Sequence, residues 1–156
     1  EYAVESSRDG GKTWQAAARV AATTVSVDGL VNGTTYVFRV ATVNGVGTGA
    51  WSARSAAVVP ATLPSAPIGL SLAGSGPVVT LAWSAPSTTG GRPIVNYRVQ
   101  WSTDGGASWK TLARAPSPAL RVTLRGLPAG SPLAFRVAAQ NAVGVGAVAE
   151  VSTAPS

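Results

Sequence analysis

The chain of 156 residues contains one pattern twice, and this repeat limits the folds that the chain can adopt. Residues 2–14 (YAVESSRDGGKTW) match residues 97–109 (YRVQWSTDGGASW) at an offset of 95 positions. Residues 29–49 match residues 126–146 at an offset of 97 positions. Solenoid and propeller repeats are shorter, at roughly 20–50 residues, whereas this period has the size of a small domain. The repeat therefore predicts two copies of one domain in tandem.

Each copy has the residue pattern of β-strands. Apolar and polar side chains alternate with period two along four segments of the second copy, at residues 78–83, 94–101, 120–127 and 133–141. Such alternation is typical of strands that place one face in a core and the other in solvent. The 18 Gly and 11 Pro residues favour many turns over long helices. We expect an all-β chain built from antiparallel sandwiches.

The composition excludes several kinds of chemistry. The chain has no His, no Cys and only six carboxylates. A typical zinc site, a thiol nucleophile and a Ser-His-Asp triad all require residue types that are missing. No run of about 18 apolar residues is present to span a membrane. We therefore expect no catalytic activity, no metal ion, no other cofactor and no membrane insertion.

Motifs in both copies resemble the fibronectin type III family. Those in the second copy are the Pro-rich segment 64–67, Trp83 followed by Ser-Ala-Pro, Tyr97-Arg98-Val99, the Gly126-Leu127 pair, Phe135-Arg136-Val137 and the loop Asn141–Gly146. Residues 29–52 of the first copy match the corresponding part of the family. The resemblance implies two immunoglobulin-like antiparallel β-sandwiches in tandem, with Trp83 in the core of the second.

The two copies are expected to differ in completeness. We place the first module at residues 1–60, a Pro-rich linker at residues 61–66, and a complete second module at residues 67–156. About thirty residues precede Tyr97 in the second module, but only one residue precedes the matching Tyr2. The first module is therefore expected to lack the family's strands A and B and to be less stable than the second. Because the chain also lacks an initial Met, we expect it to be a piece of a longer protein.

The resemblance also predicts a latch in one copy only. The tyrosine corner of such sandwiches is a Tyr whose hydroxyl bonds to nearby backbone. Tyr36 has this position in the first copy, whereas Leu133 has it in the second. We expect the second copy to hold this corner by packing alone.

A hairpin motif of the form Ser-x-Asp-x-Gly-x-Ser/Thr-Trp occurs once in each copy. Its members are Ser7, Asp9, Gly11 and Trp14 in the first copy and Ser102, Asp104, Gly106 and Trp109 in the second. The motif resembles the Asp-box of sialidase-type propellers, where it is structural, and its domain-length spacing does not suit propeller blades. The Gly-Gly pair after each aspartate suits a tight turn, and the carboxylate can accept hydrogen bonds from the backbone N–H groups of that turn. We interpret the motif as a structural hairpin and not as a glycosidase site.

The net charge of +6 is concentrated in the second module. Residues 67–156 carry seven basic and two acidic side chains, against five and four in residues 1–60. The candidate ligand face of the second module consists of Arg98, Gln100, Trp101 and Arg136. A basic face attracts anionic polymers, but no Lys-rich run or aromatic ladder indicates nucleic-acid binding. In the first module the matching region predicts a cross-strand pair of Glu5 with Arg39.

Two functions follow from these observations and from the resemblance. The first is a non-catalytic spacer, or an adhesion and interaction array, whose partners are neighbouring domains of the same polypeptide. Modules rich in Ala, Val, Gly and Arg resemble those of secreted or surface proteins of high-GC bacteria. The alternative is a module that binds cell-wall or extracellular polysaccharide, or another anionic polymer, as an accessory to a carbohydrate-active enzyme. Both predict an extracellular or cell-surface location.

Overall fold

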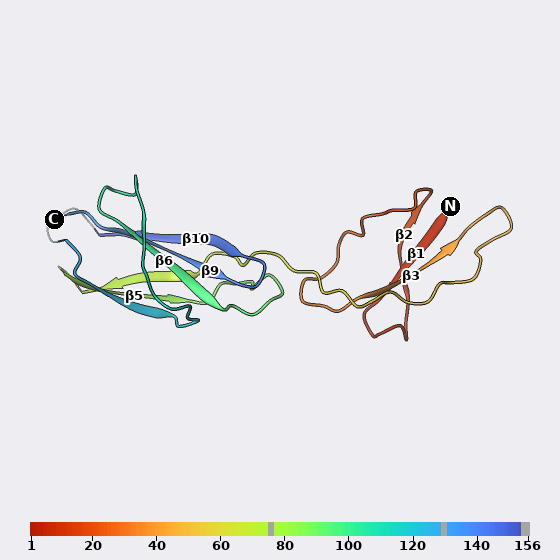
Figure 1. Ribbon diagram of the computed structural model, residues 1–156, viewed down its shortest axis with the longest axis horizontal. Coiled ribbons are helices and arrows are strands. Elements are labelled where there is room, and N and C mark those ends of the chain that lie inside the picture. Colours follow the sequence, from red (N-terminus) through yellow and green to blue (C-terminus); the bar gives the residue numbers. More distant parts are fainter. Residues whose placement is uncertain (75–76, 129–130, 154–156) are drawn as a thin grey trace. The chain divides into compact units, whose positions relative to one another are not determined.

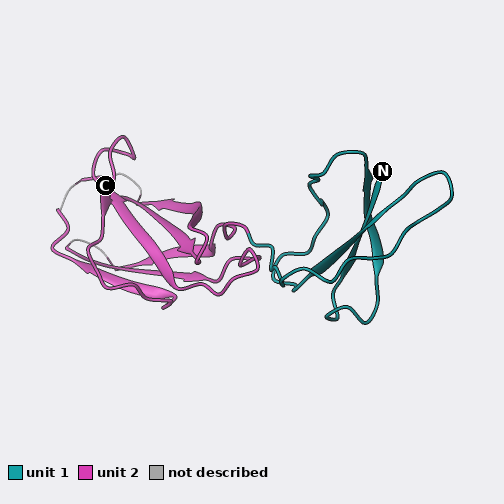
Figure 2. Cartoon of the chain, turned by 45° about the vertical axis from the view of Figure 1, so that its right-hand side comes forward, with its two compact units in different colours: residues 1–61 teal, residues 62–156 magenta. Residues whose placement is uncertain are grey.

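Antiparallel β-strands form the regular secondary structure in the part of the chain that the structure describes. The structure is a computed structural model, and it describes residues 1–74, 77–128 and 131–153. The chain divides into unit 1, Glu1–Ala61, and unit 2, Thr62–Ser156 (Figure 2). The all-β prediction is confirmed. Residues 154–156, which end the predicted second module, lie outside the described residues.

Unit 2 contains two sheets that face each other (Figure 1). One sheet has the strand order β4-β5-β8, and the other has the order β10-β9-β6-β7. The strands are β4 Ile68–Ala73, β5 Val78–Ser84, β6 Asn96–Ser102, β7 Lys110–Thr111, β8 Arg121–Arg125, β9 Ala134–Gln140 and β10 Val145–Ser152. The four alternating segments of the sequence correspond to β5, β6, β8 and β9.

The core of unit 2 lies between these sheets. Alternation along β6 and β9 directs Tyr97, Val99, Phe135 and Val137 inward, and each is at most 2% exposed. Trp83 of β5 meets Tyr97 edge-on, with ring centroids 5.3 Å apart. Burial of each large apolar side chain contributes about 1.5–3 kcal/mol. Trp83 therefore lies in the core, as predicted.

The chain segment that was predicted as a linker packs mostly onto unit 2. The Thr62 N–H donates to the Gly90 carbonyl at 2.8 Å, and the Ser65 N–H donates to the Thr88 carbonyl at 3.0 Å. Pro64 is buried, and a Cβ at Gly146 would collide with its carbonyl oxygen. Residues 62–66 therefore form the first segment of unit 2 and not a free connector.

Unit 1 contains a single three-stranded sheet within its residues 1–61, all of which the structure describes. Its strands β1 (Tyr2–Ser7), β2 (Gln15–Val20) and β3 (Val37–Thr42) have the order β2-β1-β3. Val40 of β3 is 39% exposed, although its counterpart Val137 in unit 2 is fully buried. The apolar face of this sheet thus keeps part of its surface in water.

The corner before β3 shows the predicted latch. The Tyr36 hydroxyl accepts a hydrogen bond from the Val31 N–H at 2.9 Å, and the Tyr36 side chain is 1% exposed. Leu133 has the matching position in unit 2, where it is buried and its N–H donates to the Thr153 hydroxyl at 3.0 Å. The predicted tyrosine latch is therefore present in unit 1 only, but hydrogen bonds to Thr153 hold the corner of unit 2 as well, so the expectation of packing alone is wrong.

Matched phenylalanines test the difference between the two cores. Phe135→Ala is expected to lower the free energy of unfolding of unit 2 by about 3–5 kcal/mol, because a completely buried ring is lost. Phe38→Ala, at the matching position of unit 1, is expected to cost no more than about 2 kcal/mol, because the ring already contacts water. Urea unfolding followed through NMR signals of each unit measures both losses. Equal losses would contradict the expected difference.

Candidate functional site

A hydrogen-bonded aspartate organises the β1–β2 hairpin of unit 1. One Asp9 carboxylate oxygen accepts from the Lys12 and Thr13 N–H groups, each at 2.9 Å. The Thr13 hydroxyl donates to the other oxygen at 2.6 Å. The Ser7 hydroxyl donates to Asp9 at 2.7 Å and accepts from the Gly11 N–H at 2.8 Å. The Thr13 bonds, followed by the Ser7 bond, hold the pKa of Asp9 well below its usual range.

The β6–β7 hairpin of unit 2 repeats this arrangement. Asp104 accepts from the Ser102 hydroxyl at 2.6 Å and from the Ser108 N–H at 2.9 Å. These two serines likewise hold the pKa of Asp104 well below its usual range. Gly105 and Gly106 have φ values of 69° and 95°, which side chains disfavour, so the turn requires Gly-Gly. The aspartates are therefore engaged in holding the turns.

An arginine lies under the hairpin tryptophan in both units. In unit 1 the Arg39 guanidinium carbon is 4.3 Å from the Trp14 ring centroid and 4.5 Å from that of Trp51. The Glu5 carboxylate accepts from Arg39 Nε at 2.8 Å and from Nη2 at 2.6 Å, which confirms the predicted pair. Cation–π contacts of this kind contribute about 0.5–2 kcal/mol each. Trp51 lies outside the strands of unit 1 and adds a second ring contact to the guanidinium.

The matching cluster of unit 2 keeps the stack but loses the carboxylate. The Arg136 guanidinium carbon is 4.3 Å from the Trp109 ring centroid. Arg136 Nε donates to Gln100 Oε1 at 2.8 Å, and Gln100 Nε2 donates to the Thr111 hydroxyl at 2.9 Å. A neutral amide thus orients Arg136 where unit 1 uses Glu5.

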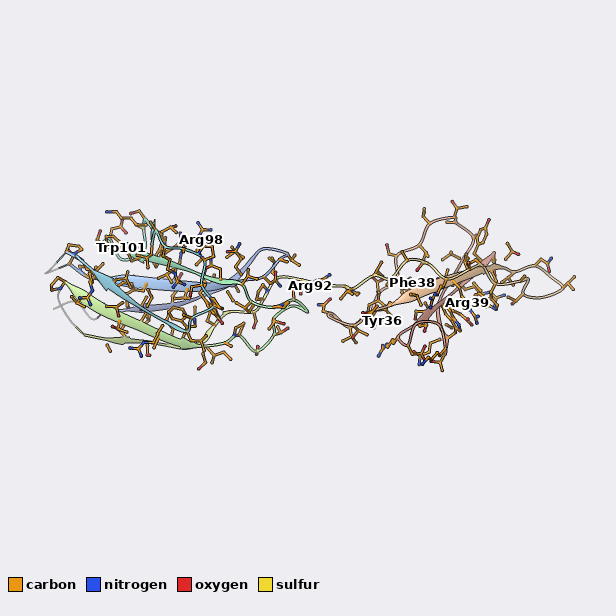
Figure 3. All side chains as sticks on the ribbon, turned by 60° about the horizontal axis from the view of Figure 1, so that its bottom comes forward. Tyr36, Phe38, Arg39, Arg92, Arg98 and Trp101 are labelled. Carbon is orange, nitrogen blue, oxygen red and sulfur yellow. The ribbon has the colours of Figure 1, made fainter. Side chains whose placement is uncertain are left out.

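The structure brings together two of the four residues of the predicted ligand face. Gln100 and Arg136 are hydrogen-bonded, and Arg98 lies on the same side of β6, exposed and two residues away. Trp101 lies on the opposite side, where it packs against the core with Lys110 Nζ 5.0 Å from its ring centroid. Arg98 and Trp101 are labelled in Figure 3. Trp101 therefore does not share a face with the other three residues.

A groove of about 510 Å³ lies beside this cluster in unit 2. Gly105 and Gly106 of the hairpin line it together with Glu150–Ser152 of β10, and Trp109 and Arg136 also line it. We call this feature the Trp109 groove. Glu150 is opposite Arg136 in the β9–β10 ladder, but the two form no salt bridge within the described residues. The sequence did not predict Glu150 as part of this site, because only the strand register shows that Glu150 lies near the hairpin.

Unit 1 fills the corresponding place with its own side chain. The Ser52 N–H donates to the Val40 carbonyl, and the Ser55 N–H donates to the Phe38 carbonyl. Two residues, Ala53 and Arg54, therefore lie between these two bonded positions, whereas in unit 2 only Glu150 lies between the partners of Val137 and Phe135. This extra residue bulges the segment. Arg54 Nη1 then donates to the Gly10 carbonyl at the hairpin tip. Arg54 thereby joins the hairpin to the segment after β3.

The described residues offer little else for chemistry. No group of His, Cys, Asp or Glu able to hold a metal ion occurs within residues 1–74, 77–128 and 131–153. No helix in that part of the chain is long and apolar enough to cross a membrane.

The two modules match the fibronectin type III domain over residues 1–58 and 65–154, and the chain belongs to this family. Human Myomesin-2 is 36% identical over 124 residues, which cover 77% of this chain. The M-protein of chicken striated muscle is 34% identical over the same length, and human cardiac-type myosin-binding protein C is 30% identical over 119 residues. The chain spans only 8–9% of these relatives.

Solved structures show the same tandem fold. Domains A168–A170 of titin align with 97% of this chain, at a TM-score of 0.60 and 21% identity, and the chain covers 53% of that structure. The FN1–FN3 domains of chicken CNTN1 align over the same share of this chain, at a TM-score of 0.53 and 18% identity, and the chain covers 54% of that structure. An all-β chain of two fibronectin type III domains in tandem is therefore confirmed as the fold.

The relatives correct the predicted location. One is named for striated muscle and another for binding myosin, which works inside muscle cells. The predicted extracellular or cell-surface location is therefore wrong. The relatives are animal proteins and support neither a bacterial source nor secretion. That prediction relied on a likeness in residue composition, which does not distinguish one compartment from another.

The hairpin aspartate predicts a pH-dependent contribution to stability. Asp104→Asn is expected to lower the urea midpoint of unit 2 at pH 7, because the carboxylate bonds are weakened. The lowered pKa of Asp104 makes this contribution complete above the unfolded-state value of about 4, and the contribution declines as the pH falls below it. The gap between variant and parent should therefore narrow steadily as the pH falls below about 4, and it should close only below the lowered pKa of Asp104.

Asp28→Asn is the matched control for this measurement, because Asp28 is exposed and lies outside both hairpins. Its urea midpoint should remain near that of the parent protein at pH 7. A gap for Asp104→Asn that stays constant down to pH 2 would argue against the carboxylate as the stabilising group.

Proposed function

We propose that the chain is a non-catalytic structural segment of a larger modular protein of the muscle type, in which it spaces neighbouring domains and carries mechanical load. The observation that carries this proposal is the anchoring of residues 62–66 on the sandwich of unit 2. The proposal is supported by the placement of the carboxylates, by this anchor and by the likeness to muscle proteins.

The acidic side chains of the chain are mostly engaged in structure. Asp9 and Asp104 hold hairpins, Glu5 pairs with Arg39, and Glu1 pairs with Arg19 at 3.0 Å. The remaining two, Asp28 and Glu150, belong to different units. An acid–base mechanism needs positioned groups within reach of one reacting bond. The distribution of carboxylates therefore supports a structural role.

The start of unit 2 is held firmly. Asn141 is 2% exposed, and its Nδ2 donates to the Thr62 and Thr89 carbonyls, each at 2.8 Å. Its Oδ1 accepts from the Val143 N–H at 2.8 Å. Tension that enters through Thr62 would therefore act on a hydrogen-bonded sandwich and not on slack chain.

The tryptophans favour this role over polysaccharide binding. Sugar binding through aromatic residues requires a flat ring open to solvent. The rings of Trp14, Trp51 and Trp109 each stack on an arginine, Trp101 has Lys110 over it, and Trp83 is in the core. The muscle relatives likewise give no support to a polysaccharide partner.

Single-molecule pulling of the whole chain tests the load-bearing role. Unit 2 is expected to unfold in one cooperative event that releases roughly 300 Å, given about 3.6 Å for each extended residue. Asn141→Ala should lower the unfolding force, because the anchor of Thr62 is lost. Asn44→Ala is the matched control, since Asn44 accepts only from the Val46 and Gly47 N–H groups of its own loop. A unit 2 that extends without a force peak would contradict the proposal.

A further inference from the structure

We propose that the Trp109 groove of unit 2 is a receptor site for an arginine side chain of a partner protein. This interaction goes beyond the structural role proposed above. The inference comes from comparing the two copies, because the matching hairpin of unit 1 already contacts an arginine side chain, that of Arg54.

The contacts of Arg54 in unit 1 define what such a groove accepts. Its terminal nitrogen donates to the Gly10 carbonyl, and its stem passes beside Gly11. A Cβ at Gly11 would lie 3.7 Å from Arg54 Cδ and 3.2 Å from the nearest Trp14 carbon. A planar guanidinium on a long apolar stem therefore suits this place between hairpin and neighbouring strand.

Unit 2 preserves the receiving side of these contacts. Gly105, Gly106 and Trp109 correspond to Gly10, Gly11 and Trp14, and a Cβ at Gly106 would lie 3.3 Å from the same Trp109 ring carbon. All three residues line the groove. Because β10 pairs with β9 in regular register from Val148 to Ser152, no residue is inserted beside Glu150 and no arginine takes the place of Arg54.

The charges of the residues that line the groove favour a cationic ligand. Glu150 lines the groove, and its position in unit 2 corresponds to that of Ala53 and Arg54 in unit 1. Arg136 is the one basic residue among the described residues that line it, and Glu150 offsets its charge. In unit 1 the cluster of Glu5, Arg39 and Arg54 carries one net positive charge. An incoming arginine would give the cluster of unit 2 the same balance.

The identity of the cation follows from geometry. Gly105 of the hairpin and Glu150 of β10 both line the groove, and each brings an acceptor, a backbone carbonyl in one case and a carboxylate in the other. A guanidinium has five N–H donors in one plane and can serve two such acceptors, whereas an ammonium is a point charge. An anion bound to Arg136 would instead face the Glu150 carboxylate. The volume of about 510 Å³ is within the usual range for ligand sites.

An NMR titration of the whole chain with N-acetyl-arginine amide tests the site. We expect shifts of the Gly105 and Gly106 amide signals and of the Trp109 indole N–H signal. The Gly10 and Gly11 amides serve as an internal control, because Arg54 occupies the matching place in unit 1. Equal shifts at these two control residues, or none at Gly105 and Gly106, would overturn the proposal.

Two variants and two further probes sharpen this test. Glu150→Gln should weaken binding about two- to fivefold, the range of one partly exposed ion pair. Glu150→Arg should abolish the shifts, because the new side chain can fill the groove as Arg54 does. Unshifted signals elsewhere in unit 2 show that both variants are folded. N-acetyl-lysine amide should bind more weakly than the arginine probe. Stronger binding of N-acetyl-aspartate amide, or unchanged binding by Glu150→Gln, would overturn the proposal.

Discussion

The burial of one face of the β6 and β9 strands is the constraint on which the architecture of unit 2 depends. Tyr97 and Phe135 on this face are enclosed by Trp83 from the opposite sheet. Once this face is fixed inward, strict alternation directs Gln100 and Arg136 outward together. The outer cluster is therefore positioned by the core, although it shares no side chain with it.

Unit 1 keeps the cluster around Arg39 on the outer face of its sheet, but the apolar inner face of that sheet is less covered than in unit 2. Its Phe38 and Val40 remain partly in water, yet Arg39 contacts two indole rings and a carboxylate. The carboxylate contact is largely shielded, since both side chains of the Glu5–Arg39 pair are about one-quarter exposed. The outer face of unit 1 thus supplies cohesion that its inner face lacks.

Local sequence patterns predicted the parts of this molecule that depend on local physics. Alternation located β5, β6, β8 and β9, and the Gly-Gly pairs predicted turns with positive φ. The grouping of Trp101 with Arg98 ignored the same alternation, which places Trp101 on the core side with Tyr97. Strict use of the period-two rule would have separated them.

The remaining features depend on strand register and could not be read locally. Glu150 meets Arg136 only through the pairing of β10 with β9, across a loop whose length does not set the register. The same limit applies to Arg54, because a bulge of one residue decides which side chain reaches the hairpin. The Trp109 groove therefore depends on the register of β10 and not on a local pattern of residues.

The serine hydroxyls after β3 have a consequence for how unit 1 behaves among other chains. Ser55 Oγ accepts from the Phe38 N–H at 3.0 Å, and Ser52 Oγ accepts from the Val40 N–H at 3.1 Å. These donors form the outer edge of β3, where a free row of amides would template pairing with a foreign strand. Side-chain oxygens cap that row without forming a regular strand. The edge is thereby protected from aggregation in a unit whose apolar face is only partly covered.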